Sequence, residues 1–89
     1  MDIKFEPTAL KQYDFFRKND KNVLRKIIEL IEDIKLHPYV GIGKPEQLKH
    51  ELTGFWSREI NSKDRIIYKV DQNIVMVYVV SAMAHYSDK

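Results

Sequence analysis

The first third of the chain changes from alternating apolar and polar residues to helical spacing. Residues 1–5 alternate between apolar and polar side chains, which predicts a short strand. Pro7 suits the first turn of a helix, where a missing amide hydrogen does no harm. Leu10, Tyr13 and Phe16 then follow at three-residue steps. This spacing predicts an amphipathic helix that ends near residue 18 or 19.

A second helical pattern follows at once. Asp20 is a suitable N-cap, because its carboxylate can accept a hydrogen bond from the amides of the first turn. His37-Pro38 ends the pattern, since proline disfavours helix in the residue before it. The apolar positions in between fall on one helical face: Val23, Leu24, Ile27, Leu30, Ile31 and Ile34. We therefore predict two helices that bury one stripe each and expose their charges.

The remaining pattern is that of strands. Residues 39–45 contain two glycines and a proline, which indicates a loop. Three strands are then predicted, over Phe55 to Ile60, Arg65 to Val70 and Ile74 to roughly Ala84, with hairpin-sized polar connections. The third is almost continuously apolar, which is typical of a strand covered on both faces. The order predicts an α+β fold, with helices against one face of a twisted sheet.

Size and composition limit the classes of protein. A chain of 89 residues supports one hydrophobic core, so residues 1–89 are expected to form a single domain, which a homodimer or another partner could stabilise. There is no cysteine, which excludes disulfides and thiolate metal sites, and the three histidines lack metal-ligand spacing; we expect neither metal nor cofactor. Without a bilayer-length apolar run or a signal-peptide profile, a cytoplasmic protein without membrane contact is expected.

Charge is unevenly distributed. The net charge is only +2, from fifteen Lys and Arg against thirteen Asp and Glu. Between Lys35 and Lys69, however, seven basic residues stand against four acidic ones. A locally basic surface on a nearly neutral protein indicates a polyanionic partner.

Three residues in or after this stretch could together cleave RNA. Singly, Glu46 is expected to be an exposed loop carboxylate, Arg65 a solvated strand residue or the partner of Glu59 or Asp64 across a turn, and His85 a frayed-end histidine. Together they match a metal-free reaction in which the RNA 2′-hydroxyl attacks the adjacent phosphorus. That reaction needs a base, a cation at the phosphorane oxygens and an acid at the departing 5′-oxygen. The sequence alone does not bring the three together.

Longer blocks carry a resemblance that covers essentially the whole chain. They are Lys35-x-x-Pro38, Gly43-Lys44-Pro45-Glu46-x-Leu48-Lys49-His50, Leu52-x-Gly54-Phe55-Trp56-Ser57-Arg58, Arg65-x-x-Tyr68 and His85-Tyr86. With these blocks the sequence resembles the YoeB/Txe family of bacterial toxins. The resemblance implies a RelE-like fold and a ribosome-dependent endoribonuclease that cleaves mRNA in the ribosomal A site and inhibits translation. It also implies neutralisation by a YefM-like antitoxin, with operator DNA bound only through the antitoxin complex.

The same resemblance implies roles for individual residues. Glu46 would be the general base, Arg65 the phosphate and transition-state cation and His85 the general acid, with Tyr86 shaping the site. The implied RNA contacts are Lys44, Lys49 and Arg58. Two departures stand out: Glu59 follows Arg58 where relatives often have a second basic residue, and Ser87-Asp88-Lys89 follow the His-Tyr pair.

Two other readings remain open at this stage. The first is a non-catalytic toxin of the same fold that acts by binding, as gyrase-inhibiting ParE toxins do. The second is a small RNA-binding module. A pure binder has no need of Glu46 and His85, and an RNA-binding module leaves the combination with Arg65 unexplained.

Overall fold

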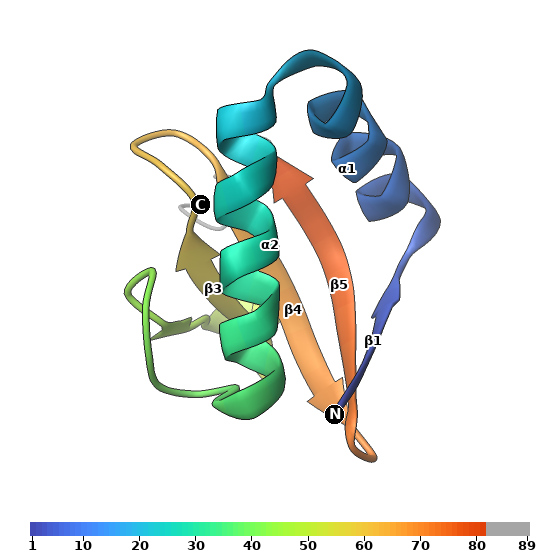
Figure 1. Ribbon diagram of the computed structural model, residues 1–89. Helices are drawn as coiled ribbons and strands as arrows, with labels where there is room; N and C mark the ends of the chain where they lie inside the picture. Colours follow the sequence, from blue (N-terminus) through green and yellow to red (C-terminus); the bar gives the residue numbers. More distant parts are fainter. Residues whose placement is uncertain (82–89) are drawn as a thin grey trace.

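The N-terminal half forms the strand and two helices that the pattern predicts. The computed structural model describes residues 1–81 (Figure 1). Strand β1 spans Asp2–Phe5, helix α1 Pro7–Asn19 and helix α2 Lys21–Leu36. The side chain of Asp20 accepts a hydrogen bond from the Val23 amide at 3.2 Å, which confirms it as the N-cap of α2. Neither helix is both long and apolar enough to cross a membrane.

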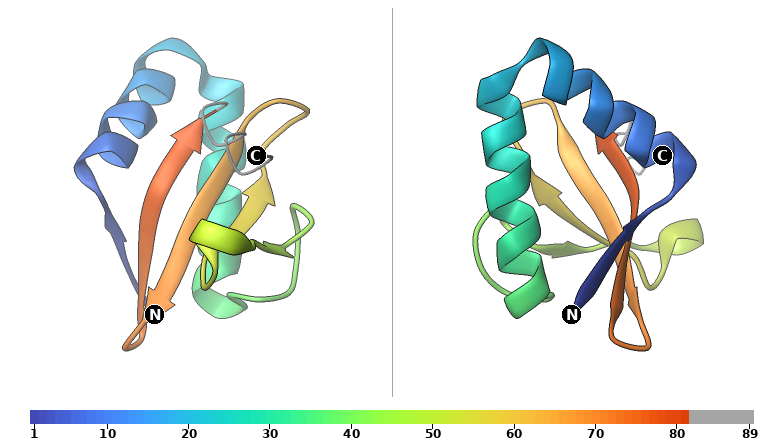
Figure 2. Two further views of the ribbon diagram at one scale, coloured as in Figure 1. Left: turned by 180° about the vertical axis from the view of Figure 1, so that it is seen from behind. Right: turned by 45° about the vertical axis from the view of Figure 1, so that its right-hand side comes forward.

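The C-terminal half supplies most of a five-stranded sheet. Its strands are β2 (Glu46–Gln47), β3 (Trp56–Glu59), β4 (Arg65–Asp71) and β5 (Ile74–Ser81). The spatial order is β1-β5-β4-β3-β2, with β1 parallel to β5 and every other pair antiparallel. Both helices lie on one face of the sheet (Figures 1 and 2). The predicted α+β fold is confirmed.

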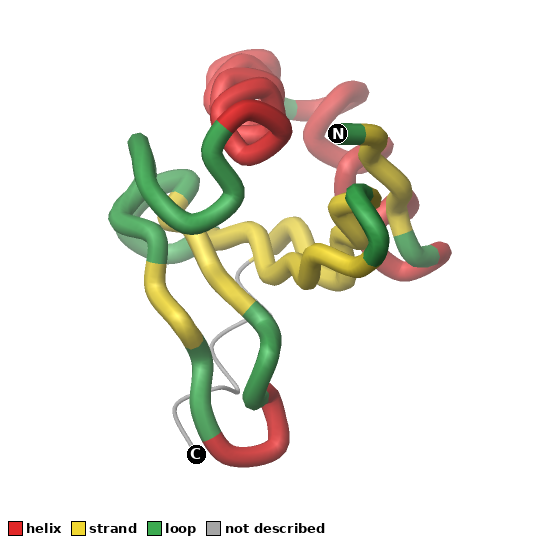
Figure 3. The backbone as a smooth tube through the Cα atoms, turned by 90° about the horizontal axis from the view of Figure 1, so that it is seen from below, coloured by secondary structure: helices red, strands yellow, loops and turns green. Residues whose placement is uncertain are grey.

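Hydrophobic side chains pack on both faces of the sheet. The main core lies between the helices and the sheet, and its buried members are Ala9, Phe16, Ile27, Leu30, Ile31, Ile34, Ile60, Ile66, Tyr68, Val75, Val77 and Val80. A smaller cluster of Leu48, Ile67 and Val79 lies on the opposite face, with Leu52, Phe55 and Tyr78 against it. The connection between β2 and β3 covers this second face, and Figure 3 shows it projecting away from the helices. β5 is therefore covered on both faces for part of its length, as its apolar sequence predicts.

The structure differs from the sequence prediction between the second helix and β3. Glu46–Gln47 pairs with β3 as a strand of two residues, and a short 3₁₀-helix, η1 (His50–Leu52), follows it. A strand this short has no periodicity to detect, so its pairing comes from the rest of the fold. The end predicted for the last strand, at residue 84, lies outside the described residues, as do His85 and Tyr86.

Candidate functional site

The candidate site lies on the sheet face opposite the helices, at the edge formed by β2, β3 and β4. Alternation along β3 directs Ser57 and Glu59 to this face, because residues two apart in a strand share a face. Glu46 pairs directly with Ser57, and Arg65 pairs directly with Glu59. Three strands thus bring together two predicted site residues that are nineteen positions apart in the sequence.

The guanidinium of Arg65 is the centre of this group. Its Nη1 donates a hydrogen bond to Oγ of Ser57 at 3.2 Å and lies 3.6 Å from Oε1 of Glu46. Its Nη2 lies 4.0 Å from Oε2 of Glu59. The Arg65 side chain is 29% exposed and that of Glu46 is 65% exposed, so both remain open to a ligand. A carboxylate and a cation are held next to each other on an accessible surface.

Glu59 has a second cationic partner in addition to Arg65. Its Oε1 lies 3.7 Å from Nζ of Lys44, whose side chain is 82% exposed. The backbone amide of Glu59 also donates to the carbonyl of Gly43 at 2.7 Å. Gly43 and Lys44 have φ angles of 80° and 53°, so the chain turns sharply just before β2. A Cβ atom on Gly43 would lie 2.6 Å from Cδ2 of Leu30 and 3.1 Å from the carbonyl oxygen of Glu59, so a larger residue would require these groups to shift.

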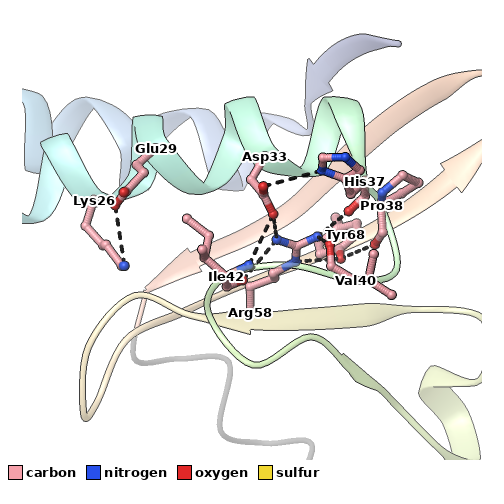
Figure 4. Close-up of polar contacts among 9 residues, drawn as sticks. All are labelled: Lys26, Glu29, Asp33, His37, Pro38, Val40, Ile42, Arg58 and Tyr68. Atoms are coloured by element: carbon pink, nitrogen blue, oxygen red, sulfur yellow. Dashed lines mark hydrogen bonds and ion pairs between the residues drawn. The ribbon is translucent and has the colours of Figure 1, made fainter.

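Arg58, on the helix side of β3, is fully buried and fixes the preceding loop (Figure 4). Its Nη1 donates to Oδ2 of Asp33 at 2.5 Å and to the carbonyl of Ile42 at 2.9 Å. Its Nη2 donates to the carbonyls of His37 and Val40, and its Nε to the Tyr68 hydroxyl at 3.3 Å. The Arg58 side chain therefore fixes both the end of α2 and the loop before Glu46 against β3.

Asp33 and Tyr68 complete this buried network. The hydrogen bond from Arg58 is the main cause that holds the pKa of the Asp33 carboxyl below its usual range, against the opposing effect of burial. Burial raises the pKa of the Tyr68 hydroxyl, which donates to the carbonyl of Pro38 at 2.5 Å. Gly41 passes so close to Asp33 that a Cβ atom would lie 2.0 Å from its Oδ2. The loop is fixed by contacts from both β3 and β4.

Arg58 lies on the opposite face of β3 from Ser57 and Glu59, among protein acceptors. The sequence resemblance implies that Arg58 contacts RNA, but its side chain has no exposed surface and every donor group has a protein acceptor. A charge that is buried in this way is tolerated because its ion-pair and hydrogen-bond partners compensate for the loss of water. Of the other expected RNA contacts, Lys44 lies beside Glu59 at the site, and Lys49 is exposed three residues after Glu46, between β2 and η1.

Sequence reasoning missed two residues that arrange this site: Ser57, which holds Arg65, and Asp33, the acidic partner of Arg58. It named Glu59 as a possible partner of Arg65, and Glu59 lies between Arg65 and Lys44. Strand alternation after Phe55 could have assigned Ser57 and Glu59 to one face and Arg58 to the other. No local signal connects Asp33 to Arg58, because they are 25 positions apart.

Within residues 1–81, no three His, Asp or Glu side chains are arranged to hold a metal ion. The chemistry available on the described part of the site is that of a carboxylate, a guanidinium and nearby ammonium groups. Such a set can accept a proton and stabilise negative charge on phosphate oxygens.

The chain matches known proteins along most of its length. Residues 5–86 match the family described as the YoeB-like toxin of bacterial type II toxin-antitoxin systems. Toxin YoeB of Synechocystis sp. is 41% identical over 97% of this chain and 98% of its own. Toxin YoeB of Escherichia coli is 43% identical over 86% of this chain and 92% of its own.

Solved structures give the same result. The heterotetrameric YoeB-YefM toxin-antitoxin complex from Staphylococcus aureus contains a chain that matches with a TM-score of 0.86 at 41% identity, over 91% of this chain and 94% of that chain. A YoeB/ParE toxin from Agrobacterium tumefaciens matches with a TM-score of 0.89 at 31% identity, over 91% and 96%. YafQ of Escherichia coli, at 20% identity and a TM-score of 0.69, shares the fold.

Proposed function

Because the chain belongs to the YoeB-like toxin family of bacterial type II toxin-antitoxin systems, we propose that it is a ribosome-dependent endoribonuclease. In this proposal it cleaves mRNA in the ribosomal A site and so inhibits translation. The observation that carries the proposal is the 3.6 Å separation between the Glu46 carboxylate and the Arg65 guanidinium on an open sheet face. A general base next to a fixed cation is what attack by a 2′-hydroxyl on phosphorus requires.

The proposed reaction needs no group beyond side chains and the RNA itself. Glu46 removes the proton from the 2′-hydroxyl, and the resulting oxygen attacks the adjacent phosphorus. Arg65 stabilises the negative charge that develops on the phosphorane oxygens, and Ser57 holds Arg65 through the hydrogen bond at 3.2 Å. In the same proposal the bond from phosphorus to the 5′-oxygen breaks as His85 donates a proton, and Tyr86 helps to shape the site. The products are a 2′,3′-cyclic phosphate and a free 5′-hydroxyl.

The proposed partners follow from the family. The Staphylococcus aureus relative has been solved as a YoeB-YefM complex and as a YoeB dimer. For this chain we propose a YefM-like antitoxin as the inhibitor, with operator DNA bound only through that complex. A homodimer of the free toxin and a cytoplasmic location, where ribosomes translate mRNA, are part of the same proposal.

The proposal is tested by reconstituted translation with purified protein. Wild-type protein should cut mRNA at the A site of programmed ribosomes and leave the cyclic phosphate end. Glu46→Gln should retain the fold and cut about 10²–10⁴ times more slowly, because an amide cannot accept the hydroxyl proton. An mRNA with a 2′-deoxy sugar at the cleaved position should bind and stay intact.

Two results would contradict the mechanism or the function. Cleavage of the 2′-deoxy mRNA would mean that water is the nucleophile. Growth inhibition by wild-type protein without any RNA cleavage, with or without ribosomes, would favour a toxin that acts by binding. Gln47→Glu is a suitable control, because it places a carboxylate one position along β2, on the opposite face, and should not restore activity to Glu46→Gln.

A further inference from the structure

The two cations of the candidate site share one internal anion. Glu59 approaches Lys44 through Oε1, at 3.7 Å, and Arg65 through Oε2, at 4.0 Å. The Glu59 carboxylate thus bridges the two cations, with one oxygen toward each. A phosphate group has the same negative charge and a similar pair of oxygens, and could bind there in the same way. We propose that the space between Lys44 and Arg65 is a second phosphate-binding position. The Glu59 carboxylate occupies it in the free protein, and a phosphate of the bound RNA displaces this carboxylate.

The two ends of the Arg65 guanidinium make the positions distinct. Nη1 faces Glu46 and Ser57, where the proposed chemistry takes place. Nη2 faces Glu59 on the other side, towards Lys44. The scissile phosphate is therefore assigned to the Nη1 side and the neighbouring phosphate of the same strand to the Nη2 side. This assignment rests on the proposed RNA-cleaving function.

The Glu59 side chain has room to move away from Lys44 and Arg65. Its side chain is 38% exposed, and that of Lys44 is 82% exposed, so both can rotate into solvent. Ion pairs at this exposure are weak, typically about 0–1 kcal/mol. The backbone of Glu59, by contrast, is fixed by its pairing with Arg65 and by the bond to Gly43. Displacement therefore requires movement of side chains alone, and its cost lowers the affinity for RNA.

Binding of a short single-stranded RNA with 2′-O-methyl sugars tests this inference, because that RNA cannot be cut. We expect Glu59→Gln to bind it about two- to fivefold more tightly, the range that corresponds to one exposed ion pair. The plot of log affinity against log salt should steepen by about 0.7, the value for one additional neutralised phosphate on a single strand. Fluorescence anisotropy over a salt series measures both quantities.

A double-mutant cycle assigns the effect to Lys44. Lys44→Gln should weaken binding less in the wild-type background than in Glu59→Gln, because RNA must first break the Lys44–Glu59 ion pair of the wild-type protein. In the Glu59→Gln background the same substitution should weaken binding about two- to fivefold. Glu29→Gln is the matched control, because Glu29 pairs with Lys26 at 3.4 Å on α2 and lies on the helix side of the sheet (Figure 4).

Three results would overturn the inference. Equal tightening by Glu29→Gln and Glu59→Gln would mean that only net charge matters. Weaker binding by Glu59→Gln would mean that Glu59 orients Arg65 instead of occupying a phosphate position. No binding by any variant would remove the second position altogether. Because the RNA probe is inert, tighter binding combined with absent cleavage of mRNA would refute the nuclease proposal and leave the phosphate position intact.

Discussion

The substitution Arg58→Lys distinguishes a buried structural arginine from an RNA-contacting one. Arg58 donates to five partners: Asp33, the carbonyls of three loop residues and Tyr68. A lysine ammonium carries three donors on a single atom and lacks the planar fork, so at least two of the five bonds are lost. At about 1 kcal/mol for each lost bond, the free energy of unfolding should fall by about 2 kcal/mol or more.

This loss is large enough to measure by thermal unfolding. In a domain of this size, 1 kcal/mol corresponds to about 4–8 °C in Tm, so Arg58→Lys should lower Tm by about 8–16 °C. Circular dichroism at neutral pH, checked by calorimetry, records the transition. Arg25→Lys is the matched control: it makes the same exchange at an exposed position of α2 and should leave Tm nearly unchanged.

A role of Arg58 in RNA contact predicts the opposite effects of Arg58→Lys on Tm and on RNA binding. If Arg58 acted by contacting RNA, Arg58→Lys would preserve Tm and weaken RNA binding, with an unchanged salt dependence because lysine carries the same charge. A Tm within about 2 °C of wild type would therefore refute the structural role that we derive from its burial. Activity of the variant should be compared well below its own Tm, where the folded fraction is the same for both proteins.

Three further outcomes are expected. Arg65→Ala should reduce RNA cleavage and Arg65→Lys should restore only part of it, because lysine supplies charge without a bidentate fork; full rescue would indicate simple electrostatics. The lowered pKa of Asp33 stabilises the fold above its ordinary pKa of 3.8, and this stabilisation is lost as pH falls through the lower folded value. Urea unfolding of Asp33→Asn should therefore show a shallower loss of stability on acidification than wild type, and an identical profile would contradict the pairing. Tyr68→Phe should cost about 1–2 kcal/mol through its bonds to Pro38 and Arg58, and an unchanged urea midpoint would show that they contribute nothing.

The helices and the long strands could be predicted because their information is local. Helical spacing located α1 and α2 to within a few residues, and the Asp20 cap and the proline at position 38 marked their ends. Alternation and apolar runs located β3, β4 and β5. In each case the period of the side chains matches the period of the backbone, so a single sequence is sufficient.

The elements that could not be predicted depend on contacts between distant residues. The pairing of Glu46–Gln47 as β2 depends on β3 and on the loop that Arg58 fixes. The burial of Arg58 depends on Asp33 and on carbonyl groups that become available only when α2 ends where it does. Arginine is exposed by default, so a local reading assigns it to solvent. The proximity of Glu46 and Arg65 likewise appears only once three strands are in register.

Strand β3 connects these two parts of the molecule through its alternation. Trp56 and Arg58 face the helices, where they pack against the main core and fix the loop before β2. Ser57 and Glu59 face the open side, where both lie next to Arg65. Because neighbouring side chains share one backbone, the bonds that fix Arg58 also fix the positions from which Ser57 and Glu59 reach Arg65. The two faces of β3 thus set stability and site geometry separately. Substitutions at Trp56 and Arg58 should lower the stability of the fold before they change the proposed RNA cleavage.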